Sequence, residues 1–281
     1  MKHSLYDDYK KFEKIMDNYE DGSESIDTSD YSYLAPTTLI PLLCNINKYN
    51  LKKIHTHQNT EKYVKEILNM KSTLTRTPYM VLPHNEKDRQ NKELSHKMAL
   101  RINEDYGGFY VLRHIISELT NNIYNHTSFE DGYANQGYTY AQEYPNLKML
   151  DICVMDDGLS IPGRFKKSGI EFTDECHAIE KAISNLSTVS KNPHERGNGL
   201  WTTVKLVVEG NKGSVLIVSD KGCLHINGIE DYKYKVLHNK NKFKGTLISV
   251  RLNKNKVQHV YDLMETFTGN PYKYNKNEGG S

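Results

Sequence analysis

The clearest pattern of apolar and polar positions lies in the middle of the chain, in FYVLRHIISELTNNIYNH (109–126). Its apolar residues recur at three- and four-residue intervals and form one arc of a helix: Leu112, Ile115, Ile116, Leu119 and Ile123. Glu118, Asn122 and Asn125 follow one another at spacings of four and three residues, on the shoulder of that arc. The pattern predicts a core-facing helix with a polar edge.

The same periodicities predict the other elements. Helical spacing predicts helices at 33–46, 61–70, 92–105, 174–186 and 200–209. Short apolar or alternating runs predict strands at 79–83, 148–155, 213–219, 222–227 and 245–252. A helix, a strand, a polar stretch, a second helix and an antiparallel meander together indicate an α+β fold. We expect an α/β sandwich with helices on one face of the sheet.

Shifts in composition suggest how the chain is organised. Residues 1–30 are polar and are expected to form a poorly ordered start, and 31–105 a small α/β module. Residues 106–255 carry the strongest patterns and form the expected main domain, and 256–281 a C-terminal helix and tail.

Composition and charge exclude several classes of protein. The chain has 281 residues, with 37 basic and 35 acidic side chains and a net charge of +2, which gives no general electrostatic argument for nucleic acid. The basic run at 233–244 is interpreted as a solvated loop between strands. There is no apolar stretch of about eighteen residues and no signal peptide, so no membrane association is expected. Four cysteines without a CxxC pair indicate a cytoplasmic protein with free, mostly buried thiols.

Three short motifs could carry chemistry. On the first helix, the Glu118 carboxylate lies one turn from the Asn122 amide, and the pair could hold a divalent cation and orient a water. A half-exposed polar shoulder is the alternative, and it is favoured for an isolated ExxxN.

The second motif is DICVMDDGLSIPG (151–163). Alternation places Asp156 on the apolar face of its strand, while Asp157 points away and can cap or solvate the turn. An inward carboxylate could accept hydrogen bonds from amino hydrogens of a bound group. The equal alternative is an Asx-turn that stabilises the loop at Gly158.

The third motif is ERGNGLW (195–201), in which two glycines precede a helix. Free N–H groups at the positive end of a helix suit phosphate oxygens. The alternative is an ordinary flexible lead-in to a helix.

The order of these motifs resembles the GHKL ATP-binding superfamily, which includes gyrase, heat-shock chaperone ATPases and histidine kinases. ISELTNNIYNH (116–126) resembles the N-box, DDGLSIP (156–162) the G1 box, RGNGL (196–200) the G2 box and KGT (244–246) the later Gly-Thr element. The resemblance covers about residues 105–253. Within the superfamily, the pattern is closest to stand-alone bacterial ATP-binding proteins and anti-sigma-factor serine kinases. AISNLST (182–188) resembles the lid segment of these proteins.

The resemblance implies a fold and a partner class. Residues 106–255 would form a Bergerat-type ATP-binding domain, a mixed sheet covered by helices on one face. The module at 31–105 faintly resembles a STAS-like segment. The expected ligands are ATP or ADP with Mg²⁺, together with a protein partner, and a homodimer stays open.

The resemblance also assigns roles residue by residue. Asn122 would bind Mg²⁺ that bridges the phosphates, and Glu118 would be the catalytic base. Asp156 would accept from the adenine amino group, with Thr246 nearby. The other nucleotide-binding residues implied by the motifs are Asn125, Gly158, Ile161, Gly197, Asn198, Gly199 and Leu200. Ser160 departs from the pattern because the G1 box usually has glycine there, and a Cβ restricts the backbone.

Three functions follow from these motifs. The first is a slow ATPase that acts as a nucleotide-dependent switch on a protein partner, its polar lid at 164–196 ordering with the nucleotide. The second is an anti-sigma-type protein-serine kinase. The third is a nucleotide-binding or partner-binding module that does not hydrolyse ATP. A sensor histidine kinase is not expected, because SHKMALRI around His96 lacks the phosphoacceptor pattern.

Overall fold

The computed structural model describes residues 3–19, 23–81, 87–126, 137–184, 199–238, 243–265 and 269–276. The helices are α1 (Leu5–Asp17), α2 (Pro36–Lys48), α3 (Glu61–Leu68), α4 (Lys87–Arg101), α5 (Phe109–His126), α6 (Ile161–Lys167), α7 (Glu175–Ile183), α8 (Gly199–Lys205) and α9 (Val260–Glu265). The strands are β1 (Ser25–Thr28), β2 (Lys53–Thr56), β3 (Arg76–Val81), β4 (Gly137–Tyr144), β5 (Met149–Asp156), β6 (Ser214–Asp220), β7 (Gly222–Ile226), β8 (Tyr232–Val236) and β9 (Phe243–Asn253).

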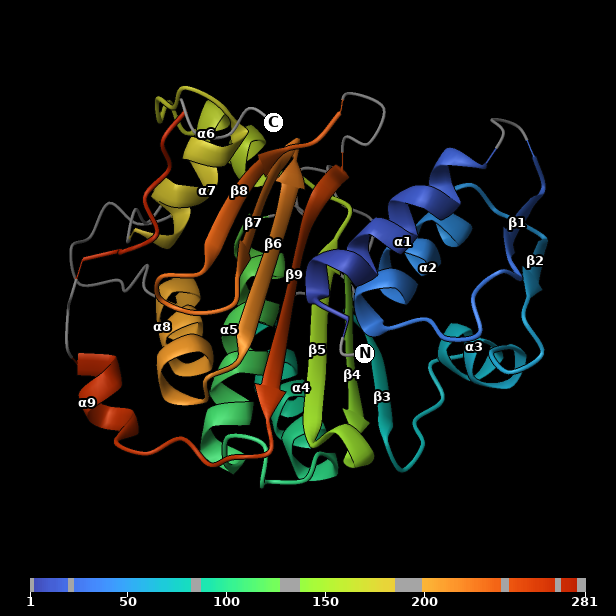
Figure 1. The fold of residues 1–281 in the computed structure, drawn as a ribbon, viewed down its shortest axis with the longest axis horizontal. Coiled ribbons are helices and arrows are strands. Elements are labelled where there is room, and N and C mark those ends of the chain that lie inside the picture. The colour runs from blue at the N-terminus through green and yellow to red at the C-terminus, as the bar shows by residue number, and fades with distance from the viewer. Residues whose placement is uncertain are drawn as a thin grey trace.

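A seven-stranded sheet in the order β3-β4-β5-β9-β6-β7-β8 forms the centre of the molecule (Figure 1). Every neighbouring pair in it is antiparallel, so the prediction of a mixed sheet is wrong. The one parallel pair among the described strands, β1 with β2, forms a separate two-stranded sheet. The fold is therefore α+β, as the sequence predicts.

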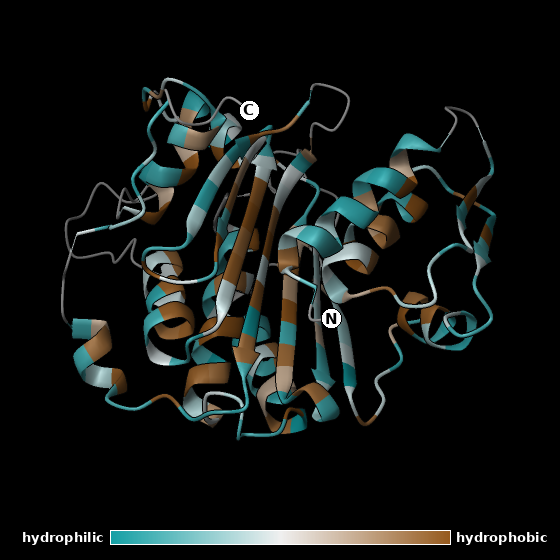
Figure 2. Cartoon of the chain, viewed as in Figure 1, coloured by the Kyte–Doolittle hydropathy of each residue, from teal (hydrophilic) through white to brown (hydrophobic). Residues whose placement is uncertain are grey.

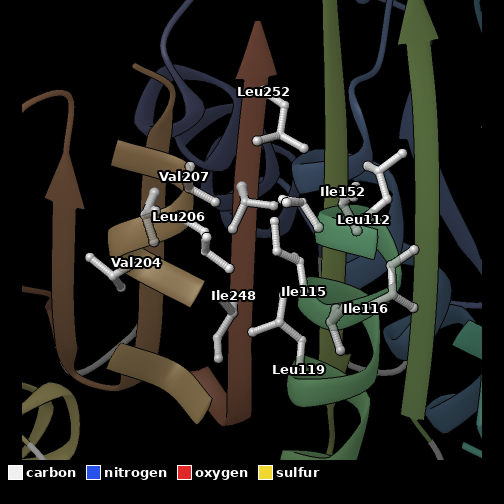
Figure 3. Packing of buried hydrophobic residues seen from close by; sticks show 14 of the residues in the cluster. Leu112, Ile115, Ile116, Leu119, Ile152, Val204, Leu206, Val207, Ile248 and Leu252 are labelled. Atoms are coloured by element: carbon white, nitrogen blue, oxygen red, sulfur yellow. The ribbon is translucent and has the colours of Figure 1, made fainter. Parts of the chain in front are cut away.

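One face of the sheet is covered by α4, α5, α7 and α8. The apolar arc of α5 packs on β5 and β9 beside α8 and the π-helical turn Leu206–Gly210 that continues it (Figure 3). Leu112, Ile115 and Leu119 are each at most 1% exposed, as expected for the core face of the helix. The predicted amphipathic helix at 109–126 is confirmed with its bounds.

The other face is covered by α1 and α2, so the prediction that helices cover one face only is wrong. Leu5 and Tyr9 of α1 and Ile40 of α2 are fully buried, in one core with residues of β5, β6 and β9. Figure 2 shows apolar residues along the central strands and hydrophilic residues on the outer side of α1. Because both faces are covered, all eight residues of β5 are buried.

The start of the chain is ordered where disorder was predicted. Ser4 caps α1: its hydroxyl accepts from the Asp7 amide at 3.1 Å, and the Asp7 carboxylate accepts from the Ser4 amide at 3.1 Å. This capping box begins a helix whose apolar side lies on the sheet. The prediction of a poorly ordered start is wrong for these residues.

The remaining predicted elements are largely confirmed. The predicted helices correspond to α2, α3, α4, α7 and α8, and the predicted strands to β3, β5, β6, β7 and β9. The basic run at 233–244 is not simply a loop, because its first residues lie in β8 at the edge of the sheet. β3 and α4, from the predicted N-terminal module, belong to the main sheet and its helical cover. The domain boundaries stay predictions.

The cysteines and the lengths of the helices bear on two further predictions. The four cysteines are free and buried, as predicted. Within the described part of the chain, no helix combines the length and the apolarity needed to cross a membrane.

Candidate functional site

The polar shoulder of α5 lies against the start of α8. At Gly199, an added Cβ would come 1.9 Å from Oε2 of Glu118 and 2.9 Å from its Cδ. The backbone of α8 can therefore approach the carboxylate this closely only because residue 199 is glycine. Two motifs that lie about eighty residues apart in the sequence thus meet in space.

A second contact joins the same two helices one turn earlier on α5. The His114 Nε2 atom lies 3.2 Å from the Thr202 hydroxyl, and that hydroxyl donates to the Gly199 carbonyl at 3.0 Å. Burial lowers the pKa of His114, which favours the neutral imidazole. The contact fixes α8 along α5 at the level of Glu118.

Glu118 is partly buried, and burial raises the pKa of its carboxyl. A carboxyl with a raised pKa is a better proton acceptor than an exposed one, and raised carboxyl pKa values are typical of catalytic bases. Asn122, one turn further along α5, is also partly exposed. The side-chain placement of Asn125 lies outside the described residues.

A second polar group lies where β5 ends. Asp156 pairs with Thr246 of β9 in the antiparallel register. Its carboxylate accepts from the Gly158 amide at 2.9 Å and also from the Thr246 amide. The Asx-turn alternative is therefore confirmed as local structure, and it leaves the carboxylate on the core face with Val154 and Ile152, as the alternation predicts.

The buried hydroxyl of Ser219 connects this group to β6. It accepts from the Ile161 amide at 2.8 Å, donates to the Gly245 carbonyl at 3.2 Å and lies 2.9 Å from the Thr246 hydroxyl. One serine thereby fixes the start of β9 and the start of α6. The sequence analysis missed Ser219, although it follows Val215 and Ile217 at a spacing of two, which places it on the core face of β6.

Gly245 packs directly against Asp156. Its φ is +92°, and an added Cβ would come 2.0 Å from the carbonyl oxygen of Asp156 and 3.0 Å from its Oδ1. Only glycine satisfies both requirements. This explains in physical terms why a glycine precedes Thr246.

Burial is the largest cause that raises the pKa of Asp156 to about 8, and the neighbouring charge of Asp157 adds to it. Asp157 itself is 3% exposed, so of its two predicted roles, capping or solvating the turn, the second is wrong. A buried carboxylate of this kind gains from a bound group that donates hydrogen bonds to it.

The two polar groups lie on one face of the sheet, towards the same end. Ile123, which follows Asn122 on α5, packs over Gly137, where an added Cβ would come 2.8 Å from it. Gly137 pairs with Asp156 in the β4–β5 register. The end of α5 that carries Asn122 therefore covers the end of β5 that carries Asp156.

Ser160, the departure from the G1 pattern, has an ordinary conformation. Its φ is −67°, and its hydroxyl accepts from the Gly163 amide at 3.1 Å as the N-cap of α6. The serine therefore starts a helix without backbone strain.

The predicted site residues thus fall into three sets. The structure brings Gly199 against Glu118, with Asn122 one turn further along the same helix and Leu200 partly buried against the core. It also brings together Asp156, Gly158, Ile161 and Thr246. Gly197 and Asn198 lie outside the described residues, together with residues 185–196 of the predicted lid.

A magnesium ion suits the first set. Asn122 and Glu118 offer amide and carboxylate oxygens, the ligands that Mg²⁺ prefers, and the ion commonly uses only one or two protein ligands beside phosphates and water. In the described ranges, no cluster of three or more His, Cys, Asp or Glu is arranged to hold a metal. A dedicated all-protein metal cage is therefore not found there.

Comparison with known proteins assigns no family to the chain. A scan against protein-family models finds no match, and a search among curated proteins finds none either. Inference about function therefore rests on the residues and their geometry.

Proposed function

We propose that this chain binds Mg-ATP in a Bergerat-type site and hydrolyses it slowly, as a nucleotide-dependent switch on a protein partner. The observation that carries the proposal is the convergence of separate motifs. Asp156 and Thr246 are neighbours at one end of the central strands β5 and β9, and the Glu118–Asn122 shoulder of α5 extends over the same end.

The adenine end of the site would lie at Asp156. Its carboxylate is buried, and Thr246 and Ser219 provide hydroxyls beside it. An acceptor flanked by hydroxyl groups matches the edge of an adenine ring, which offers an amino group next to a ring nitrogen. Gly158 leaves space for the base to approach the backbone.

The phosphate end would lie between α5 and the start of α8. Asn122 would hold Mg²⁺, which supplies charge neutralisation to the phosphates. Glu118 would accept a proton from the attacking water, and its raised pKa suits this role. Gly199 gives the α8 backbone the close approach that phosphate binding at a helix start requires.

The decisive experiment compares the wild-type protein with Glu118→Ala and Asp156→Asn. We expect Asp156→Asn to weaken Mg-ATP binding by about tenfold or more, since asparagine cannot take the ionised form that attracts the adenine amino hydrogens. We expect Glu118→Ala to retain binding and to lose phosphate release by about a hundredfold. Calorimetry measures the first, and a phosphate-release assay the second.

The outcomes separate the three functions. Unchanged ATP affinity in Asp156→Asn would refute the adenine role. Equal phosphate release in the wild type and Glu118→Ala, with ATP still bound, would leave the non-hydrolysing module. Transfer of labelled phosphate to a co-purified protein, dependent on Glu118, would favour the serine kinase, because the same base could act on a hydroxyl.

A further inference from the structure

A short segment without regular secondary structure, Asn270–Tyr274, runs alongside α7 and is called the strap here (Figure 1). Its side chains and backbone also contact α8 and β8. Its central residue, Tyr272, is fully buried. The Tyr272 ring meets the ring of Trp201 on α8 edge-on, with centroids 6.3 Å apart, and that of Tyr232 on β8 at 5.3 Å. One aromatic side chain thus anchors the strap in the main core.

Polar contacts hold both ends of the strap to α7. The Asn270 amide donates to the Ser184 hydroxyl at 2.8 Å, at the end of α7. The Tyr274 hydroxyl donates to the Asp174 carboxylate at 3.0 Å, and the Tyr274 backbone amide donates to Glu180 at 3.1 Å. Asp174 is the N-cap of α7, so the strap spans that helix from end to end.

The strap is bound as peptide ligands are bound. Its backbone belongs to no strand, and several of its main-chain groups pair with side chains of the domain. The Tyr234 hydroxyl donates to the Tyr272 carbonyl at 2.9 Å, and the Tyr232 hydroxyl to the Lys273 carbonyl at 3.3 Å. A buried aromatic anchor with polar contacts on either side is the usual pattern of a peptide-recognition site.

The residue that Tyr272 contacts on α8, Trp201, lies close to the candidate nucleotide site. Trp201 is two residues from Gly199, whose backbone touches the Glu118 carboxylate. α8 is therefore held between the strap on one side and α5 on the other. Because the Gly199–Glu118 contact leaves no spare space, a small displacement of α8 would move the backbone at the proposed phosphate end.

We infer that the surface formed by α7, α8 and β8 is a peptide-docking site, that the chain's own strap occupies it, and that docking tightens nucleotide binding. The docking site stands on the strap contacts alone. The coupling rests on the proposed function. Since coupling between two binding sites is reciprocal, nucleotide must tighten strap docking by the same factor.

Trp201 makes docking measurable, because it is the only tryptophan in the chain. The full-length Tyr272→Ala variant should free the strap, expose Trp201 and shift its emission to longer wavelength. Tyr272→Phe is the matched control, since it keeps the ring. Added peptide GNPYKYNK (269–276) should restore the emission of Tyr272→Ala, and the same peptide with Tyr272→Ala should not.

The coupling is tested by titrating Mg-ATP into the same proteins. Tyr272→Ala should bind it at least about fivefold more weakly, and saturating peptide should restore the affinity. Tyr274→Ala, which removes a partly exposed ring and its bond to Asp174, should weaken both properties in the same direction if Tyr272→Ala does not fold.

Three results would overturn parts of this inference. If the peptide leaves the Trp201 emission of folded Tyr272→Ala unchanged, the docking site is refuted. Peptide that docks without changing ATP affinity refutes the coupling. A wild-type protein that binds no Mg-ATP refutes the proposed function and the coupling, while recovery of Trp201 emission by the peptide would still support the docking site.

Discussion

Gly199 lies directly on the Glu118 carboxylate, with the position of a hypothetical Cβ only 1.9 Å from Oε2. The obstructing atom is the far end of a flexible side chain, so Gly199→Ala should cost little stability, less than about 1 kcal/mol. The displaced carboxylate, however, would no longer be placed to accept a proton. We expect phosphate release to fall at least about tenfold, measured beside urea unfolding of the same samples.

The double variant Gly199→Ala with Glu118→Ala is the control for this prediction. If the alanine acts through the carboxylate, it should add no further loss of phosphate release to that of Glu118→Ala. An additional loss of similar size would show that Gly199 contributes independently of Glu118.

Gly245 should respond in the opposite way. Its clash is with the backbone oxygen of Asp156 at 2.0 Å, which cannot rotate away, and its φ of +92° disfavours any side chain. We expect Gly245→Ala to lower the free energy of unfolding by about 3 kcal/mol or more. Gly108→Ala is matched in backbone, because Gly108 has a φ of +98° and no atom within 4 Å of an added Cβ. It should lose only about 1–2 kcal/mol, and equal losses in urea unfolding would contradict the clash.

Much of this arrangement could be predicted from local patterns. The arc of α5 and the alternation of β5 each depend on a single periodicity, and both are confirmed. Ile152 and Val154 of β5 belong to one core, and Cys153 and Met155 belong to the other. The N-terminal helix was missed because its short apolar side is spread among acids and lysines. The apolar side of this helix is buried only because it packs on the sheet face formed by β5, β6 and β9, and these strands are distant from it in the sequence.

The contacts within the candidate site were less accessible to sequence reasoning. Gly199 was noted as a flexible position, yet its packing on Glu118 depends on how two helices cross. Ser219 is an ordinary serine in an apolar strand until β9 and α6 bring a carbonyl and an amide to it. β4 is not among the predicted strands, although Tyr138 and Tyr140 alternate into one core.

Asp156 should make stability depend on pH. Burial raises the pKa of its carboxyl to about 8, above the value of the unfolded chain. Between about pH 4 and pH 8 the folded protein therefore holds a proton that the unfolded chain has released, so the contribution of Asp156 to stability is lost as pH rises. Asp156→Asn removes this loss. We expect its melting temperature relative to wild type to increase from about pH 5 to pH 8 and to level off above pH 8.

The comparison is made by thermal unfolding of both proteins in one series of buffers without nucleotide. Asp157→Asn serves as the control, since it removes the neighbouring charge that helps to raise the pKa of Asp156 and should shift the wild-type dependence to lower pH without abolishing it. A difference between Asp156→Asn and wild type that stays constant over this range would contradict the raised pKa.

The buried pair Arg251–Asp151 should be the most costly polar interaction to break. The Arg251 guanidinium donates to both oxygens of Asp151, at 2.7 and 2.8 Å, and Asp151 is fully buried. The Arg251 guanidinium also donates to Asp8 of α1 at 3.4 Å and to the His3 carbonyl, so it links the sheet to the N-terminal helix.

Arg251→Met keeps the bulk of the side chain but leaves a buried carboxylate without its cation. This should lower the free energy of unfolding, measured in urea, by about 3–5 kcal/mol. Lys65→Met in the exposed pair Lys65–Glu61 is the control, and no measurable loss of stability is expected for it. Adding Asp151→Leu to Arg251→Met should recover much of the loss, because an apolar pair removes the uncompensated charge; no recovery would show that the contacts to α1, and not the buried charge, dominate the cost.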